Sequence, residues 1–262
     1  MRLGRLPHDP AALARAPSFA AHHFAAVKPP VLLDRSHIEF MPGLYRNDDL
    51  PDCSAAGLAN AAGMVAALNG YGLAVNPDKV PLFYAACAGC DATDAAMQAT
   101  DGAVLLTVLA RQVRSGFDVG PQTLVGLHGT VPLDRSVLAS AMTRLGHVYL
   151  GVTLRERDME LPAVWDVLDG RDDGAVVGGH CVVAFDYAGL QDSAVVRLAT
   201  WGAWMPATWA WIAARTGSGQ GEAHALVWRQ LGNAVGSDLD VNADLLEAEL
   251  KEMAALDLLP LV

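Results

Sequence analysis

The amino-acid sequence predicts an α+β fold in which a helical half precedes an antiparallel strand half. Three observations support this prediction. Residues 53–69 form a run of small apolar residues that has the length of a buried helix. Further helical patterns continue to about residue 145. Short apolar runs separated by polar turns then extend from residue 147 to residue 228, as expected for strands.

The N-terminal residues 1–30 are predicted to form an extended arm. They contain five prolines and a single short helical pattern, at residues 11–16. Residues 31–50 show little periodicity and are predicted to form a loop. The helical lobe then covers about residues 50–145, with expected helices at 53–69, 76–84, 100–115 and 136–145. Asp101 is the expected N-cap of the third of these helices.

The strand lobe is predicted at about residues 146–232. Its expected strands are residues 147–154, 176–187, 194–201 and 223–228, with a polar turn at 169–175. An amphipathic helix at about residues 243–257 ends the chain. The predicted organisation is therefore an arm at 1–30 and a single domain at 31–262.

The amino-acid composition indicates a folded protein and disfavours some classes of binding partner. The 262 residues are 52% hydrophobic and 18% charged, which suits a protein with a full hydrophobic core. A net charge of −11 disfavours nucleic acid and anionic membranes as partners. No signal peptide or membrane span is expected from the hydrophobic pattern. We expect a soluble protein of a cytoplasm.

Two of the four cysteines form the motif Cys87-Ala88-Gly89-Cys90. A redox pair or half of a zinc site are the functional interpretations. No second such motif supplies further zinc ligands, and the motif follows a helical pattern rather than a strand. Small buried thiols or a local disulfide are therefore favoured, and no cofactor or metal is expected. Cys181 is interpreted as a core residue.

Cys53 and His180 carry the clearest chemical signal. Cys53 opens the predicted helix at 53–69, where unpaired N–H groups and the helix dipole stabilise a thiolate. His180 follows 180 − 53 = 127 residues later, in an apolar run typical of a buried strand. The next apolar run ends in Thr200-Trp201-Gly202. Each residue alone is more often structural, so the prediction depends on their order and spacing.

This pattern resembles the papain-like cysteine hydrolases, in which the histidine lies roughly 130–150 residues after the cysteine. The resemblance covers about residues 40–230 and implies a papain-like α+β fold. It also implies Cys53 as nucleophile, His180 as base and Asn47 as a donor to the oxyanion. Trp201 would shield the histidine, and Gly179 and Thr200 would line the substrate site.

The sequence departs from the papain pattern in two places. Ala199 falls where the family has the asparagine that orients the histidine, and Ser54 replaces an aromatic residue after the cysteine. Thr200 is expected to point away from His180, because successive strand residues face opposite sides. A charged Asp52 directed inward would raise the pKa of the Cys53 thiol.

The sequence is also similar to uncharacterised proteins of bacteriophages and prophages. The shared features are an opening, an Asn-Asp pair, an Asp-Cys pair, a Thr-Asp-Gly and a late Thr-Trp-Gly. Here they are residues 3–7, 47–48, 52–53, 100–102 and 200–202. This resemblance implies a phage-encoded protein of the host cytoplasm or the virion.

Two functions follow. The first is a cysteine hydrolase that cleaves peptide or amide bonds through a Cys53 thioester, with His180 as base. The alternative is a weak or inactive papain-fold protein that acts in a phage virion through its N-terminal arm. For the enzyme, we expect the Cys53 sulfur within about 4.5 Å of a His180 ring nitrogen. The arm is expected to lie along the back of the domain or on a neighbouring subunit, and blocking of the cleft is the second option.

Overall fold

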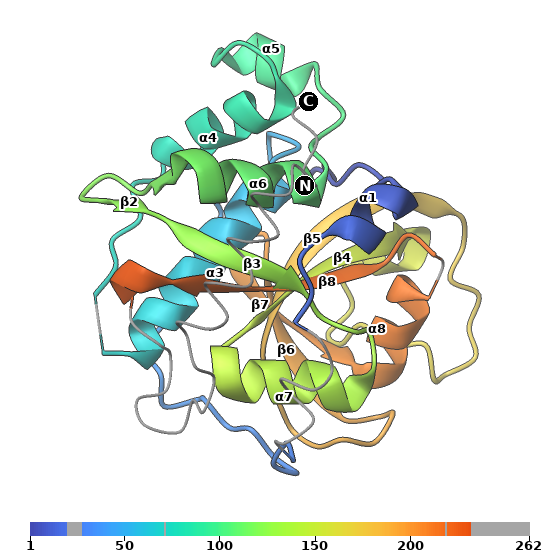
Figure 1. Ribbon diagram of the computed structural model, residues 1–262. Helices are drawn as coiled ribbons and strands as arrows, with labels where there is room; N and C mark the ends of the chain where they lie inside the picture. Colours follow the sequence, from blue (N-terminus) through green and yellow to red (C-terminus); the bar gives the residue numbers. More distant parts are fainter. Residues whose placement is uncertain (20–27, 71, 218, 232–262) are drawn as a thin grey trace.

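The computed structural model describes residues 1–19, 28–70, 72–217 and 219–231. A short helix α1 (Pro10–Arg15) lies in the N-terminal arm. The remaining α-helices, shown in Figure 1, are α3 (Cys53–Leu68), α4 (Lys79–Ala88), α5 (Asp94–Gln98), α6 (Leu105–Ser115), α7 (Arg135–Leu145) and α8 (Trp209–Thr216). The helix expected at about 243–257 lies outside the described residues. No helix in the described part of the chain has the length and apolar character needed to cross a membrane.

A six-stranded antiparallel sheet forms the centre of the molecule, in the order β3-β8-β4-β5-β6-β7. Its strands are β3 (Gly126–Thr130), β4 (Val148–Arg155), β5 (Val176–Tyr187), β6 (Val195–Thr200), β7 (Ala203–Thr208) and β8 (Glu222–Trp228). A separate two-stranded ribbon joins β1 (Phe117–Asp118) to β2 (Thr123–Leu124). Short 3₁₀ helices follow β4 and β8, at Glu156–Glu160 and Arg229–Leu231.

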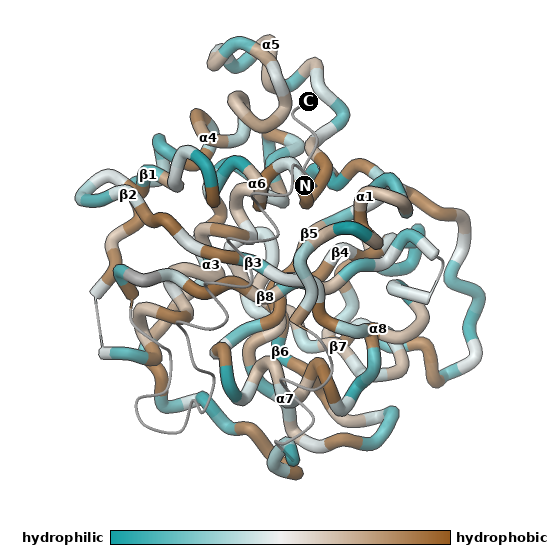
Figure 2. Tube along the Cα trace, viewed as in Figure 1, coloured by the Kyte–Doolittle hydropathy of each residue, from teal (hydrophilic) through white to brown (hydrophobic). Residues whose placement is uncertain are grey.

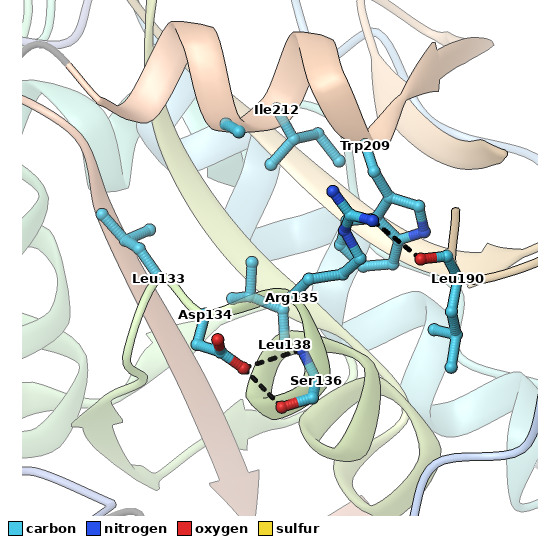
Figure 3. Close-up of a pocket in the computed structure, with 9 residues that line it drawn as sticks. Leu133, Asp134, Arg135, Ser136, Leu138, Leu190, Trp209 and Ile212 are labelled. Carbon is cyan, nitrogen blue, oxygen red and sulfur yellow. Dashed lines mark hydrogen bonds between the residues drawn. The ribbon is translucent and has the colours of Figure 1, made fainter. Parts of the chain in front are cut away.

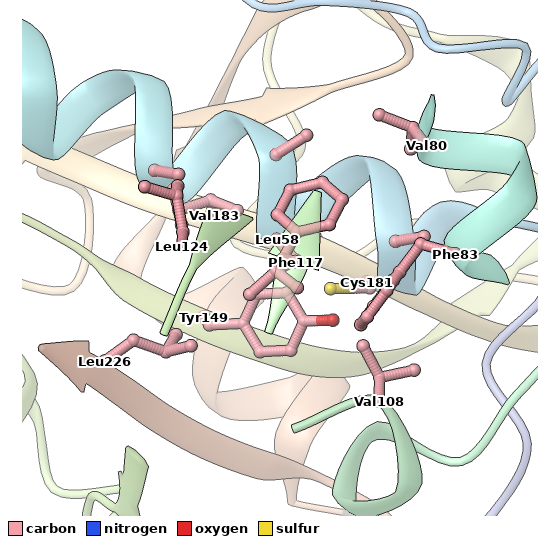
Figure 4. Close-up of a cluster of buried hydrophobic side chains, with 14 of the residues drawn as sticks. Leu58, Val80, Phe83, Val108, Phe117, Leu124, Tyr149, Cys181, Val183 and Leu226 are labelled. Atoms are coloured by element: carbon pink, nitrogen blue, oxygen red, sulfur yellow. The ribbon is translucent and has the colours of Figure 1, made fainter. Parts of the chain in front are cut away.

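Each face of the sheet supports its own hydrophobic core. On one face, α3, α4 and α6 pack over side chains that include Tyr149, Cys181 and Val183, as Figure 4 shows. On the other face, α7 and α8 enclose a second core around Val182, Leu198 and Trp211. Hydrophobic segments accordingly concentrate in the central strands, whereas the outer loops are more hydrophilic (Figure 2).

Helix α3 packs directly against the sheet through small residues. All its residues from Cys53 to Ala66 are buried. At Gly57 an added Cβ would lie 2.8 Å from the Cys181 sulfur and 2.9 Å from the Tyr149 ring. The Tyr149 hydroxyl also donates a hydrogen bond of 2.6 Å to the Ser54 carbonyl. This contact fixes the first turn of α3, and with it Cys53, against β4 and β5.

Several elements differ from the sequence-based expectation. Helix α4 begins at Lys79 rather than residue 76, and α6 begins at Leu105 rather than residue 100. Asp101 is exposed and does not cap α6, whose N-cap is Val104. The physical reason is that Ala103 is extended and pairs with Arg5 of the N-terminal arm. Strands β3 and β7 and helices α5 and α8 were not predicted.

Candidate active site

Cys53 occupies the first position of α3 and is only 1% exposed. The N–H groups of a first helical turn have no partners within the helix. The preceding Asp52 makes no side-chain hydrogen bond to them. A thiol and a set of backbone donors are therefore brought together at one helix end, as the sequence predicts.

The Cys53 thiol is protonated in this structure. Burial raises its pKa to about 12, and Asp52, which is ionised at so high a pH, adds to this rise. The backbone at Cys181 and Gly4 acts in the opposite direction and favours the thiolate. Desolvation outweighs the donors, because a thiolate shut away from water loses most of its solvation. The reactive thiolate expected from the helix position is not the state seen here.

His180 lies on β5, fully buried. Its Nε2 atom is 2.6 Å from the Thr200 hydroxyl, and its ring stacks on Trp201 with centroids 4.3 Å apart. Burial, together with the nearby positive charge of Arg5, lowers the pKa of His180 to about 3. The Nδ1 atom has no hydrogen-bond partner, so Cys53 and His180 are not hydrogen-bonded to each other. The imidazole is therefore neutral, with Nε2 hydrogen-bonded to Thr200 and Nδ1 without a hydrogen-bond partner.

The Thr200 hydroxyl contacts the His180 imidazole, the contact that the papain resemblance assigns to an asparagine at position 199. The expectation that it points away from His180 is wrong. Strand β6 pairs Ala199 with Val183 and Leu198 with Ala184, a register that brings Thr200 level with residue 182. Residues 180 and 182 share a strand face, so Thr200 reaches the imidazole. The aligned position, Ala199, faces the α3 side with Cys181 and Val183.

Trp201 holds its ring over His180 because of the tight turn between β6 and β7. Both turn residues have positive φ, 46° at Trp201 and 72° at Gly202, which is the pattern of a two-residue hairpin. The indole N–H donates to the Arg2 carbonyl at 3.3 Å. Its ring meets Trp165 edge-on at 6.0 Å, and Trp165 stacks on Trp211 at 4.6 Å. Aromatic packing thus fixes the imidazole from the second core.

Asn47 and Asp52 are buried residues of the loop that leads into α3 and Cys53. The Asn47 amide donates to the Leu50 carbonyl at 3.3 Å and so holds the loop that precedes α3. Burial raises the pKa of Asp52 to about 8, although the nearby Asn47 amide opposes this rise. Asp52 is therefore uncharged at neutral pH. The assignment of Asn47 as an oxyanion donor stays a prediction.

The N-terminal residues Arg2–Leu6 lie directly over this site. The Gly4 carbonyl accepts from the Ala103 N–H at 2.8 Å, and the Leu6 N–H donates to the Ala103 carbonyl at 3.1 Å. On the other side, the Arg5 N–H donates to the Gly179 carbonyl at 3.1 Å. The segment therefore runs as an extended strand between the helical half and the sheet. The expectation that the arm lies on the back of the domain is not met by these residues.

Two glycines allow this close approach. A Cβ added at Gly4 would lie 1.8 Å from the Pro51 carbonyl oxygen, and one at Gly102 would lie 1.8 Å from the Gly4 oxygen. Gly102 also has a φ of 119°, which favours glycine. The motif at residues 3–7 and the Thr-Asp-Gly motif at residues 100–102 thus pack against each other. The sequence alone showed both motifs but gave no sign that they meet.

A cavity in the described part of the chain lies away from this site. It measures about 460 Å³ and is situated between the start of α7 and α8, where Leu133, Leu190 and Trp209 form part of its wall. Arg135 crosses it and donates to the Leu190 carbonyl, and Asp134 caps α7 (Figure 3). None of the residues predicted to act in the site lines this cavity.

All four cysteines are free thiols. Cys87 lies within α4, and Cys90 follows the left-handed Gly89 that ends this helix. Burial raises the pKa of Cys87 to about 12. The local disulfide considered from the sequence is absent.

Comparison with known proteins identifies the fold. No family model and no curated protein matches this chain. Among solved structures, it is similar to xylellain, a cysteine protease from Xylella fastidiosa, with a TM-score of 0.61 and 13% identity, over 86% of this chain and 95% of that one. It is also similar to procathepsin B S9 of Trypanosoma congolense, with a TM-score of 0.57 and 11% identity, over 85% of each chain. Digestive procathepsin L 3 of the Tenebrio molitor larval midgut gives a TM-score of 0.54 at 14% identity, over 83% of this chain and 77% of that one. The chain has an α+β, papain-like fold.

Proposed function

We propose that this protein is a papain-like cysteine peptidase or amidase whose own N-terminal segment keeps it latent. The observation that carries the proposal is the arrangement around the thiol. Cys53 opens the central helix, His180 is held by Thr200 and Trp201, and residues 2–6 lie over both as a peptide ligand would. The similarity to xylellain and the two procathepsins supports the fold in which this chemistry is placed.

The proposed reaction is acyl transfer through a thioester. The Cys53 sulfur attacks the substrate carbonyl carbon, and His180 takes the thiol proton on its free Nδ1. The carbonyl oxygen becomes negative and is stabilised by the unpartnered N–H groups at the start of α3. The C–N bond then breaks as His180 gives its proton to the leaving nitrogen. Water activated by His180 hydrolyses the thioester and restores the thiol.

The docked segment explains why the residues are present in an unreactive state. Desolvation is the largest cause of both the raised pKa of Cys53 and the lowered pKa of His180. A dry, neutral pair does not attack a carbonyl at a useful rate, because the thiolate is the nucleophile. When the segment leaves, water enters and both pKa values move toward their ordinary range. The pair can then form the thiolate and imidazolium.

The alternative function is that of a structural or interaction protein. It is favoured by the absence of a hydrogen bond between Cys53 and His180 and by the complete burial of both side chains. If this alternative is correct, the N-terminal arm contributes only to the stability of the protein or to its assembly into a phage virion. Phage origin and a place in the host cytoplasm are expectations from the sequence resemblance and form part of this proposal.

The substitution Gly4→Ala, which adds one methyl group, distinguishes the two proposed functions experimentally. In the full chain, Gly4→Ala should force the segment out of the site, because its Cβ would collide with the Pro51 carbonyl. Gly72→Ala is a matched control, since nothing lies within 4 Å of that position and its φ is not positive. We expect Gly4→Ala to speed the modification of Cys53 by iodoacetamide about tenfold or more at pH 7, as a destabilisation of 1–2 kcal/mol would do.

The same variant is then tested for hydrolysis of a mixed peptide library. Activity should appear with Gly4→Ala and disappear when Cys53→Ser or His180→Ala is added. A folded Gly4→Ala protein that exposes Cys53 but cleaves no peptide would support the structural function. Unchanged Cys53 labelling would show that the segment does not control access to the thiol.

A further inference from the structure

Cys181 is a second buried thiol beside the candidate site. It follows His180 on β5 and is 2% exposed. Successive strand residues face opposite sides of a sheet, so these two side chains point apart. The His180 ring stacks on Trp201, whereas the Cys181 sulfur is directed toward α3, beside the Tyr149 ring (Figure 4). Cys181 therefore shares the core under α3 with Cys53.

A glycine lets the Cys181 sulfur reach the helix that carries Cys53. A Cβ added at Gly57 would lie 2.8 Å from this sulfur, so a residue without a side chain is needed there. Gly57 lies four residues after Cys53 on α3. Residues at this spacing lie on one face of a helix, about one turn apart. The two thiols are therefore neighbours on the same face of α3.

The two cysteines also influence each other electrostatically. The backbone at Cys181 favours the thiolate form of Cys53. Burial raises the pKa of the Cys181 thiol well above its ordinary value, and a charge on Cys53 adds to this rise. Because Coulomb interactions weaken with distance, this mutual effect agrees with the short separation that the Gly57 contact indicates.

The two thiols differ in their access to an oxidant. Residues 2–6 cover Cys53, and their departure would admit water and allow a thiolate to form at the start of α3. Cys181 lies deeper, between α3 and the sheet, and stays protonated, so dissolved oxidants react with it slowly. An oxidant that enters the opened site therefore meets Cys53 first, and Cys181 is the thiol beside the oxidised sulfur.

We propose that Cys53 and Cys181 form a reversible redox pair, in which a hydroperoxide oxidises Cys53 and Cys181 then captures it in a disulfide. The inference goes beyond the proposed function and takes from it only the release of residues 2–6, so it does not require peptide cleavage. The disulfide protects Cys53, because a sulfenic acid that reacts with a thiol is not oxidised further to irreversible acids. Until it is reduced, Cys53 cannot act as a nucleophile.

The oxidation proceeds in two steps. The Cys53 thiolate attacks one oxygen of the peroxide. An S–O bond forms, the O–O bond breaks, and the hydroxide that leaves takes up a proton to become water. The Cys181 sulfur then attacks the sulfur of the Cys53 sulfenic acid. The S–S bond forms, the S–O bond breaks, and the oxygen leaves as water with the Cys181 proton. The pair of electrons lost by the thiols is gained by the peroxide, and a dithiol reverses the change by thiol–disulfide exchange.

Mass spectrometry tests the pair in the opened full chain. A chain carrying Gly4→Ala, which displaces the segment, is treated with hydrogen peroxide and digested without reduction. We expect a disulfide between the peptides of Cys53 and Cys181, and dithiothreitol should then restore the labelling of Cys53 by iodoacetamide. With Cys181→Ser added, oxidation of Cys53 should continue to the sulfinic and sulfonic acids. The labelling recovered after dithiothreitol should therefore fall about fivefold or more.

Cys90→Ser is the matched control, because Cys90 is a partly buried thiol that lies after α4. It should leave the disulfide and the recovery of labelling unchanged. Cys181→Ala is a second variant, which removes the thiol without placing a hydroxyl in the core, and it should behave as Cys181→Ser does. Several results would each overturn the proposal: a disulfide to Cys87 or Cys90, a stable sulfenic acid beside a reduced Cys181, equal recovery with and without Cys181, or no oxidation of the opened chain.

Peptide hydrolysis by the same samples separates this proposal from the proposed function. If the disulfide forms in a chain that cleaves no peptide before oxidation or after reduction, the redox pair is correct and the peptidase is not. If peroxide abolishes hydrolysis irreversibly and no disulfide forms, the peptidase is correct and the redox pair is not. Hydrolysis that is lost as the disulfide forms and regained with dithiothreitol supports both.

Discussion

At the scale of single residues, burial sets the charge of Cys53, Asp52 and His180. Cys53 and Asp52 hold their protons and His180 lacks one, in each case chiefly because of desolvation. The sequence predicted the identity of Cys53 and His180 from order and spacing. It did not predict their protonation, because the charge of a group depends on what covers it in the folded chain.

Asp52 gives a prediction about pH. Its folded-state pKa of about 8 lies above the ordinary value of 3.8. The folded state therefore binds more protons than the unfolded state between these values, and the stability contributed by this group is lost as pH rises toward 8. Asp52→Asn removes this loss. We expect its thermal midpoint to exceed that of the wild type by about 3–6 °C at pH 7.5, and to match it near pH 4.

Scanning calorimetry at the two pH values measures this effect. Asp48→Asn is a suitable control, because Asp48 is exposed. A midpoint difference between Asp52→Asn and wild type that is the same at both pH values would show that Asp52 is charged in the folded protein.

At the scale of elements, the hairpin of β6 and β7 determines how the histidine is held. The helix α3 and strands β4, β5, β6 and β8 were predicted close to their observed bounds, because their apolar runs are long and uninterrupted. Strand β7 was missed, and so was the role of Thr200. Strand register is set by pairing with a distant strand, which a local pattern does not contain.

Thr200 is predicted to act as a positioning residue through its hydroxyl. In the Gly4→Ala chain, Thr200→Val keeps the shape of the side chain and removes its hydrogen bond to Nε2 of His180. We expect kcat to fall about tenfold with little change in KM, since a lost hydrogen bond of about 1 kcal/mol misplaces the base. Peptide hydrolysis by purified variants measures this.

Thr200→Ser provides the control, because it retains the hydroxyl and should restore most of the activity. If serine and valine at this position reduce kcat equally, the packing of the methyl group matters rather than the hydrogen bond, and the positioning role is wrong.

At the scale of the whole molecule, the N-terminal segment joins the two halves of the fold. It bonds to Ala103 in the helical half and to Gly179 in the sheet, and Trp201 donates to its Arg2 carbonyl. Figure 1 shows the N-terminus between α6 and the start of β5. Residues 2–6 are thus a structural part of the site rather than a separate tether.

Hydrogen exchange should report this docking. The amide protons of Arg5, Leu6 and Ala103 are hydrogen-bonded between the segment and the domain. Gly4→Ala should increase their exchange rates about tenfold or more, because local opening then requires less free energy. Amides of Val183 and Leu198 in the core should exchange as in the wild type. Faster exchange throughout the core would instead indicate that the substitution destabilises the whole domain.

The sequence by itself determined the α+β class, the central helix and most strands of the sheet, and it predicted Cys53 and His180 as the candidate pair. These features depend on local periodicity, on composition and on the order of residues along the chain. The tertiary structure alone decided that Thr200 holds His180, that Gly4 and Gly102 meet, and that Arg5 pairs with Glu222 across 217 positions of the chain. Each of these contacts joins residues through strand register or close backbone approach. Such contacts exist only when distant segments are packed together, so no local pattern encodes them.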